Sequence, residues 1–142
     1  MQLSKIPLPQ LMISAQRGLT LGLSVEGKCV AMSIVERRQS LFELMLLAVD
    51  PLHQRQGYAR ELLFHTMDYI RLLGGKTLDA GAGNADIQSF LFLQRHGFRV
   101  VGVIPDHYYS SNARPEVENS IVNRDMIRYS ADLTELAPQL PQ

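Results

Sequence analysis

The alternation of apolar and polar positions predicts a sheet in the first third of the chain. Residues 19–25 alternate apolar residues with small or polar ones, as a half-buried strand does. The turn residues 26–28 lead into a second strand-like segment, 29–35, which predicts a hairpin. Residues 41–49 are nearly continuously apolar, which is typical of a strand buried on both faces. The three strands together predict an antiparallel meander.

The second half of the chain predicts helices that alternate with strands. Apolar residues at helical spacing predict a helix over 58–73, which two glycines would end, and another over 86–95. Strands are expected at 76–82, 98–104 and 119–129. This order predicts an α/β (α+β) fold, with helices packed against a mixed sheet.

The two ends of the chain carry weaker patterns. Residues 1–18 are poorly patterned and predict at most a short helix over 9–17. Residues 131–142 are rich in proline and glutamine, and we expect a frayed tail there. The whole chain, 1–142, has the length of one domain.

Composition and charge exclude several classes of function. The 14 basic residues balance the 14 acidic ones, which argues against a general attraction to nucleic acid or to an anionic membrane. The apolar runs are too short to cross a bilayer. Cys29 is the single cysteine, and the four histidines lack zinc-ligand spacing, so we expect no metal and a cytoplasmic protein.

One segment predicts an anion site, because a buried strand leads through a short loop into a helix at Tyr58. A helix N-terminus presents backbone N–H groups and the positive end of the helix dipole, which suits phosphate. Gly57 lets the backbone approach a ligand, and Arg55 and Arg60 add positive charge. No Gly-Lys-Ser/Thr follows, so this is not a Walker loop, and an ordinary strand-to-helix connection is the alternative.

The same loop resembles a known family signature. Gln54-Arg55-Gln56-Gly57-Tyr58-Ala59 is similar to the Gln/Arg-x-x-Gly-x-Gly/Ala motif of the GNAT superfamily of N-acetyltransferases. The resemblance extends to Ala48-Val49-Asp50-Pro51, to Arg95-His96-Gly97-Phe98 and to the segment 118–128. It covers roughly residues 19–129, and the chain resembles the small bacterial members of the family.

The resemblance implies a fold and a reaction. The implied GNAT fold has a mixed, mostly antiparallel sheet of six to seven strands, splayed in the middle, with helices on both faces. The implied reaction transfers an acetyl group from acetyl-CoA directly to a primary amine of a small molecule or peptide. The loop amides would hold the pyrophosphate of acetyl-CoA.

The resemblance also implies cofactor contacts on both sides of the place where the sheet is splayed. In the strand and loop these are Leu47, Ala48, Val49, Gln54, Arg55, Gln56, Gly57, Tyr58, Ala59 and Arg60. Asn84, Asp86 and Ser89 would contact the pantetheine arm, although a simple helix cap explains Asn84 or Asp86 equally well.

Glu43 is the candidate general base. It is the one charged residue in an apolar strand, where a carboxylate is costly unless it is paired or hydrogen-bonded. Many family members place a catalytic glutamate at the matching position, whereas an outward-facing or ion-paired structural residue is the alternative. The resemblance places the amide that binds the oxyanion near Leu46 or Leu47, where the family strand commonly bulges.

The resemblance does not assign the general acid to one residue, because Leu93 stands where many members have a tyrosine. Tyr108 or Tyr109 would replace that tyrosine, or would only line the substrate site or the core. His107 could serve as a base, or be merely solvated. The leucine also motivates a different class of function, a non-catalytic module that binds acyl-CoA or a protein partner.

A second motif supports a rival interpretation. Residues 77–83, Thr-Leu-Asp-Ala-Gly-Ala-Gly, resemble the S-adenosylmethionine loop of class I methyltransferases, with Asp106 as the ribose ligand. Only 36 residues follow Asp106, too few for the rest of that fully parallel fold.

The short N-terminal segment leaves little chain for the two helices that often form a wall of the acceptor site in the GNAT family. The resemblance therefore implies an acceptor site that is open or that a second subunit of a homodimer completes.

Overall fold

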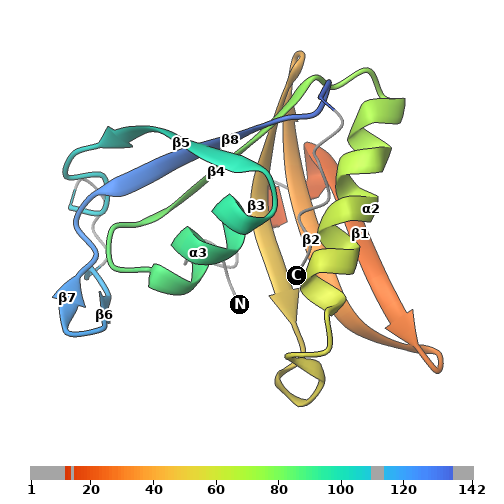
Figure 1. Cartoon of the computed structure of the whole chain (residues 1–142), viewed down its shortest axis with the longest axis horizontal. Helices are drawn as coiled ribbons and strands as arrows, with labels where there is room; N and C mark the ends of the chain where they lie inside the picture. The colour runs from red at the N-terminus through yellow and green to blue at the C-terminus, as the bar shows by residue number, and fades with distance from the viewer. Residues whose placement is uncertain (1–11, 14, 110–113, 136–142) are drawn as a thin grey trace.

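The computed structural model describes residues 12–13, 15–109 and 114–135 (Figure 1). Along these residues the elements are β1 (Gly18–Val25), β2 (Lys28–Arg38), β3 (Leu41–Val49), the 3-10 helix η1 (Pro51–His53), α2 (Tyr58–Leu72), β4 (Thr77–Gly83), α3 (Ile87–Arg95), β5 (Phe98–Ile104), β6 (Val117–Glu118), β7 (Ile121–Val122) and β8 (Met126–Asp132). Residues 12–13 and 15–16 are also helical, whereas the rest of the helix predicted over 9–17 lies mainly outside the described residues.

The main sheet has six strands in the order β1-β2-β3-β4-β8-β5, and β6 pairs separately with β7. β3 and β4 are parallel, and the other neighbouring strands are antiparallel. The predicted mixed and mostly antiparallel sheet is therefore confirmed. The methyltransferase alternative is wrong, because β8 lies between β4 and β5 and runs antiparallel to both.

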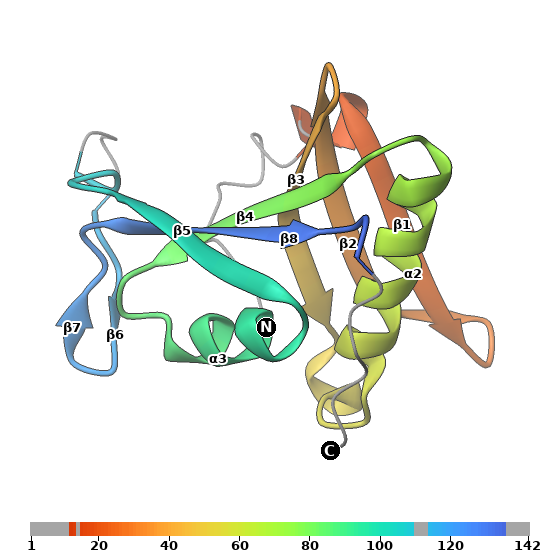
Figure 2. The same cartoon turned by 45° about the horizontal axis from the view of Figure 1, so that its top comes forward.

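The sheet is splayed between β3 and β4. These strands pair at only two positions, Glu43 with Asp79 and Leu44 with Ala80, whereas β4 pairs with β8 along its whole length. Figure 2 shows β3 running down with β1 and β2 while β4 turns away with β8 and β5. The ends of β3 and β4 thus enclose a wedge, and α2 begins at the side where β3 ends.

One core fills the face of the sheet that carries both long helices. The connections β3–α2–β4 and β4–α3–β5 advance in the same direction, and right-handed crossovers place both helices on the same face. Buried residues from β3, α2, β4, α3 and β8 form a single cluster that includes Leu47, Leu63, Leu78, Leu93 and Tyr129. On the other face, a smaller cluster of Ile34 and Met45 packs against Ala15 and Leu46.

Both long helices end as the glycines predict. Gly74 has a φ of 85°, and its N–H and that of Gly75 donate to the carbonyls of Arg71 and Ile70. A Cβ on Gly75 would lie 2.3 Å from Ile70 Cγ2, so no side chain fits there. Gly97, with a φ of 97°, follows α3 in the same way.

The prediction of the last strand is wrong in its position. Asn119 and Ser120, both with positive φ, form the turn between β6 and β7, so the strand predicted over 119–129 begins only at Met126. A turn of two residues cannot be distinguished from a polar interruption of a strand by alternation alone.

The expected tail is also wrong for its first residues. β8 continues to Asp132, and Leu133 is buried. The N–H of Leu133 donates to the Lys76 carbonyl at 2.8 Å, and its own carbonyl accepts from Arg71 Nε at 2.8 Å. Residues 136–142 lie outside the described residues. No described helix is long and apolar enough to cross a membrane.

Candidate functional site

The loop after β3 is held by its own side chains. The Asp50 carboxylate accepts from the Leu52 N–H at 3.2 Å and lies 3.1 Å from Nδ1 of His53. The Leu52 hydrogen bond, and secondarily His53, lower the pKa of Asp50 below its ordinary value. Gln54 Nε2 donates to the Val49 carbonyl at 3.2 Å. The loop therefore enters α2 with a defined path.

Gly57 gives the start of α2 its open approach. It is the N-cap with a φ of 83°, no side chain caps the helix there, and nothing lies within 4 Å of where its Cβ would be. The first hydrogen bond within the helix joins the Glu61 N–H to the Gly57 carbonyl. The N–H groups of Tyr58, Ala59 and Arg60 therefore have no carbonyl in the helix to bind. This end of α2 can accept an anion.

The other residues expected near the cofactor divide into exposed and buried groups. Gln54, Arg55 and Gln56 are exposed at the loop surface. The Leu47 and Val49 side chains are buried in the core cluster, so only their backbone could meet a ligand. Ala48 lies half-buried between them.

β3 contains a bulge at Met45. Ile34 pairs with Leu46 and Val35 with Leu44, so Met45 is the extra residue of β3 between these two pairs. The bulge turns both Leu44 and Leu47 toward the core. It lies directly before the Leu46–Leu47 segment where the resemblance places the oxyanion amide, and it begins at the last residue of β3 that pairs with β4.

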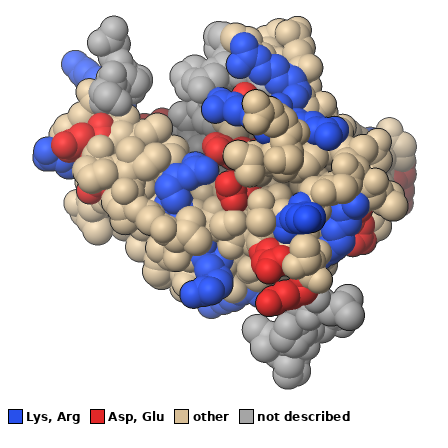
Figure 3. Space-filling view, turned by 90° about the horizontal axis from the view of Figure 1, so that it is seen from above, with Lys and Arg blue, Asp and Glu red and all other residues tan. Residues whose placement is uncertain are grey.

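Glu43 lies in a pocket of about 180 Å³ on the face of the sheet opposite the long helices. The lining residues are Glu36, Arg38, Leu41, Phe42, Glu43, Asp79 and Arg128. The surface seen from above Figure 1 carries acidic side chains near its middle, with basic side chains on several sides (Figure 3). The pocket can therefore meet a ligand with groups of both charges.

Three carboxylates of this pocket lie in one row across the sheet. Glu36 is opposite Glu43 in β2 and β3, and Glu43 is opposite Asp79 in β3 and β4. Like charges opposite one another destabilise a sheet unless they are compensated. Two arginines compensate these charges: Arg38 Nε donates to Glu36 at 2.9 Å, and Arg128 Nη2 donates to Glu43 at 3.0 Å.

The third carboxylate, Asp79, accepts from Ser130 Oγ at 2.7 Å. Sequence reasoning missed both Asp79 and Arg128 as site residues. Their place depends on strand register, which local patterning does not fix.

The two candidate general acids lie outside this pocket lining. Tyr108 is half-buried, and burial, with the charges of Asp86 and Glu118, raises its pKa to about 12. The positive charge of Arg128 acts on Tyr108 in the opposite direction, so both Tyr108 and Glu43 lie within the influence of one arginine. Tyr109 is exposed, and the Arg124 guanidinium lies 4.7 Å from its ring centre.

A further tyrosine, Tyr129, was not predicted as a site residue. It is 0% exposed, and its hydroxyl has no hydrogen-bond partner among the described residues. Burial, with the charge of Asp86, raises its pKa to about 12. Leu93, at the position where the family commonly has a tyrosine, is buried in the same core cluster.

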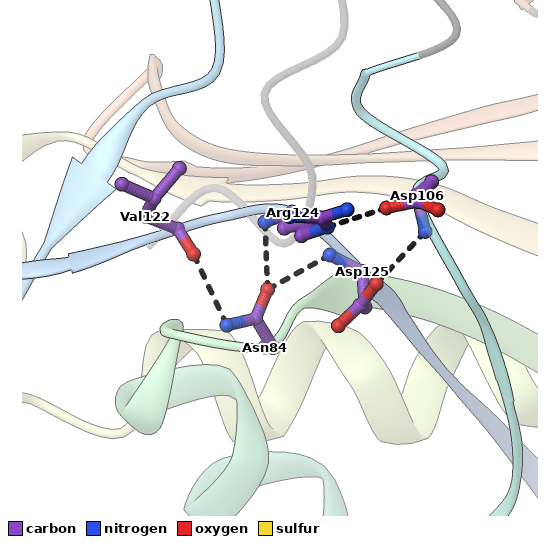
Figure 4. A network of polar contacts seen from close by, with 5 residues as sticks. All are labelled: Asn84, Asp106, Val122, Arg124 and Asp125. Carbon is purple, nitrogen blue, oxygen red and sulfur yellow. Dashed lines mark hydrogen bonds and ion pairs between the residues drawn. The ribbon is translucent and has the colours of Figure 1, made fainter.

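Asn84 holds the end of β4 to the chain that enters β8 (Figure 4). Its Oδ1 accepts from the N–H groups of Arg124 at 2.8 Å and Asp125 at 2.9 Å, and its Nδ2 donates to the Val122 carbonyl at 3.1 Å. Arg124 also pairs with Asp106, which raises the pKa of the arginine. Asn84 thus has a structural role in addition to the predicted cofactor contact.

Asp86 is the N-cap of α3, as the simpler interpretation predicts. Its Oδ1 accepts from the Ser89 N–H at 3.0 Å, and its Oδ2 accepts from Ser89 Oγ at 2.7 Å. These bonds stabilise the start of α3. Contacts of Asp86 and Ser89 with the pantetheine arm stay a prediction. Within the described part of the chain, no group of three or more His, Cys, Asp or Glu side chains could hold a metal ion.

Comparison with known proteins adds an independent finding. The model of the acetyltransferase (GNAT) family matches residues 4–98. The chain is 28% identical over 100 residues to an uncharacterized N-acetyltransferase, YvbK, of Bacillus subtilis. This match covers 70% of this chain and 64% of that protein. It is 28% identical over 101 residues to the [ribosomal protein bS18]-alanine N-acetyltransferase of Escherichia coli K12, covering 71% and 68% of the two chains.

Solved structures agree with the fold. The IAA acetyltransferase from Bacillus cereus superposes with a TM-score of 0.82 at 28% identity, covering 92% of this chain and 87% of that one. A GNAT family acetyltransferase from Elizabethkingia anophelis with acetyl-CoA bound has a TM-score of 0.85 at 20% identity, covering 92% and 86%. The match to YvbK spans less than two thirds of that protein's length.

Tyr108 and Tyr129 should titrate late. Because folding holds Tyr108 and Tyr129 neutral, both phenols should stay protonated as pH rises from 10 toward about 12. The free energy of unfolding should fall over the same interval, since the unfolded chain releases these protons first. Ultraviolet titration of phenolate, folded and in denaturant, measures this, and Tyr108→Phe and Tyr129→Phe should each remove one late transition. Identical folded and unfolded titrations would contradict the assignment.

Proposed function

Because the chain belongs to the acetyltransferase (GNAT) family, we propose that it transfers the acetyl group of acetyl-CoA directly to a primary amine. The observation that carries this proposal is the wedge between β3 and β4 with the uncapped N-terminus of α2 beside it. A phosphate group fits such a helix end, because its N–H groups and dipole are directed at the ligand. The acyl arm would then lie between the diverging strands.

The cofactor contacts follow from the same geometry. Gln56, Gly57, Tyr58, Ala59 and Arg60 would surround the pyrophosphate, mainly through backbone N–H groups. Arg55 would add charge from the loop surface, and Gln54, through its bond to Val49, would hold the loop in position. The backbone of 47–49 borders the wedge and would meet the pantetheine arm, with Asn84, Asp86 and Ser89 on the opposite side.

The reaction needs three proton or charge events. The amine nitrogen attacks the thioester carbonyl and loses a proton to Glu43, directly or through water. A backbone N–H after the bulge at Met45 would stabilise the developing oxyanion. As the carbon–sulfur bond breaks, the thiolate takes a proton, and Tyr108 or Tyr109 would supply it. Tyr108 is protonated at neutral pH, as a tyrosine ordinarily is, and its raised pKa makes it a weaker acid.

The acceptor would enter the pocket on the side away from the long helices. A volume of about 180 Å³ holds the amine end of a molecule, so the rest of a larger acceptor would lie outside. The carboxylates of the lining can bind the amine nitrogen at this mouth, where Arg38 and Arg17 pair with Glu36 and Arg128 pairs with Glu43. A relative that acts on the alanine of a ribosomal protein is compatible with a peptide acceptor, and a small molecule fits equally well.

The single cysteine supports a cytoplasmic location.

Replacement of Gly57 tests the phosphate loop. Gly57→Ala should weaken acetyl-CoA binding about 10-fold, or about 1.4 kcal/mol, because it strains the left-handed residue and places a methyl group over the helix N-terminus. Gly74→Ala is the matched control, with a φ of 85° and equally open surroundings at the other end of α2. Calorimetry with acetyl-CoA measures both. Equal affinities in the two variants would contradict the assigned loop.

Replacement of Glu43 tests the base. Glu43→Gln should lower kcat by about 100-fold or more, the usual contribution of general base catalysis, while the Kd for acetyl-CoA stays unchanged. Thiol release from acetyl-CoA with a panel of amines measures turnover. Glu26→Gln, in the exposed turn between β1 and β2, is the control. Undiminished turnover in Glu43→Gln would remove Glu43 from this role.

We also propose a homodimer, on the evidence of β5. This strand is an edge of the main sheet, and Val100, Val101, Val103 and Ile104 are all exposed along it. An exposed apolar edge strand can pair with its symmetry mate across a two-fold axis. Sedimentation should show a dimer, and Val101→Lys combined with Val103→Lys should shift it to monomer. Wild-type protein that stays monomeric at high concentration would contradict this.

A further inference from the structure

We propose that Arg128 is a positioning residue for Glu43, and that the glycine at position 81 exists to let it reach that carboxylate. This inference rests on the proposed function, because it assigns Arg128 a role in preparing the proposed base. No feature of the local sequence connects the two residues, which are 85 positions apart.

The reach of Arg128 is unusual, because it crosses a whole strand. Arg128 lies in β8 opposite Gly81 of β4, whereas Glu43 lies in β3, on the other side of β4. Its Nη2 nevertheless donates to Glu43 Oε1 at 3.0 Å, with the two side chains 22% and 38% exposed. The ion pair therefore joins the two halves of the splayed sheet at the place where they begin to separate.

Gly81 makes this crossing possible. A Cβ on Gly81 would lie 2.7 Å from Arg128 Nη1 and 2.6 Å from Met126 Sδ, which is closer than real contacts allow. Both atoms are ends of flexible side chains, so an alanine would displace them without a clash against backbone. Arg128 would then lose its path over β4 toward Glu43.

The charges around Glu43 explain why it needs to be held. Glu36 and Asp79 are directly opposite it on the two neighbouring strands, and both are acidic. Glu36 and Asp79 have partners of their own in Arg38 and Ser130, and Arg128 gives Glu43 its ion pair within this row of like charges. Arg128 Nη2 donates to Oε1, so the ion pair fixes one oxygen of the carboxylate. Such fixed geometry favours proton transfer.

Kinetics of Gly81→Ala, Arg128→Met and the double variant test this inference. Thiol release from acetyl-CoA is measured with spermidine, kanamycin and an alanine-leading peptide amide as acceptors, and with water alone as the baseline. Arg128→Met and Gly81→Ala should each lower kcat about 10- to 100-fold, since misplaced catalytic groups cost this much, and leave KM for acetyl-CoA unchanged. The double variant should be no slower than Arg128→Met.

The control for Gly81 is Gly102→Ala in β5 of the same sheet, where a Cβ meets nothing within 4 Å. Gly102→Ala should match wild type, and thermal unfolding reports whether each variant is folded. If Gly81→Ala does not fold, the separation of kcat from KM in Arg128→Met alone decides the matter.

Two results would overturn the inference while leaving the proposed function in place. Arg128→Met with undiminished kcat, alongside an inactive Glu43→Gln, would show that the base needs no such partner. Equal further losses from Gly81→Ala in the wild-type and Arg128→Met backgrounds would show that Gly81 does not act through Arg128. Wild-type protein that neither binds acetyl-CoA nor releases thiol would instead refute the proposed function, and the inference with it.

Discussion

The short pairing between β3 and β4 is the constraint on which the candidate site depends. After Glu43–Asp79 and Leu44–Ala80 the two strands part, so beyond these pairs each strand has an edge along the wedge. Such an edge is costly without a ligand, because backbone N–H and C=O groups seek partners. The bulge at Met45 begins where the pairing stops, and it redirects the strand so that the core side chains still face α2.

The two faces of the sheet differ in what they carry. On one face, α2 and α3 pack on a common core and bring the open N-terminus of α2 to the end of β3. On the other, a polar pocket gathers Glu36, Glu43 and Asp79 with two arginines. A donor with phosphate groups and an acceptor with an ammonium group would thus approach from different sides and meet where the strands part.

Local patterning predicts well what depends on neighbouring residues. The loop around Gly57 and the ends of both long helices follow from glycine conformation and helix periodicity, and all lie where the sequence places them. What depends on register is absent from local patterning. Asp79 and Arg128 join Glu43 only through strand pairing, and Leu133 is buried only because β8 lies beside β4.

The glycines of β4 show how a motif can be similar to one function and serve another. In the methyltransferase interpretation, the residues 77–83 would wrap a cofactor. In the sheet, Gly81 leaves room for Arg128, and a Cβ on Gly83 would lie 2.1 Å from Asn123 Oδ1. That oxygen accepts from the Ala85 N–H at 2.9 Å, and so ties the start of α3 to the chain before β8. Both glycines therefore admit side chains from the β8 side across β4, and packing within this sheet accounts for them without a second cofactor.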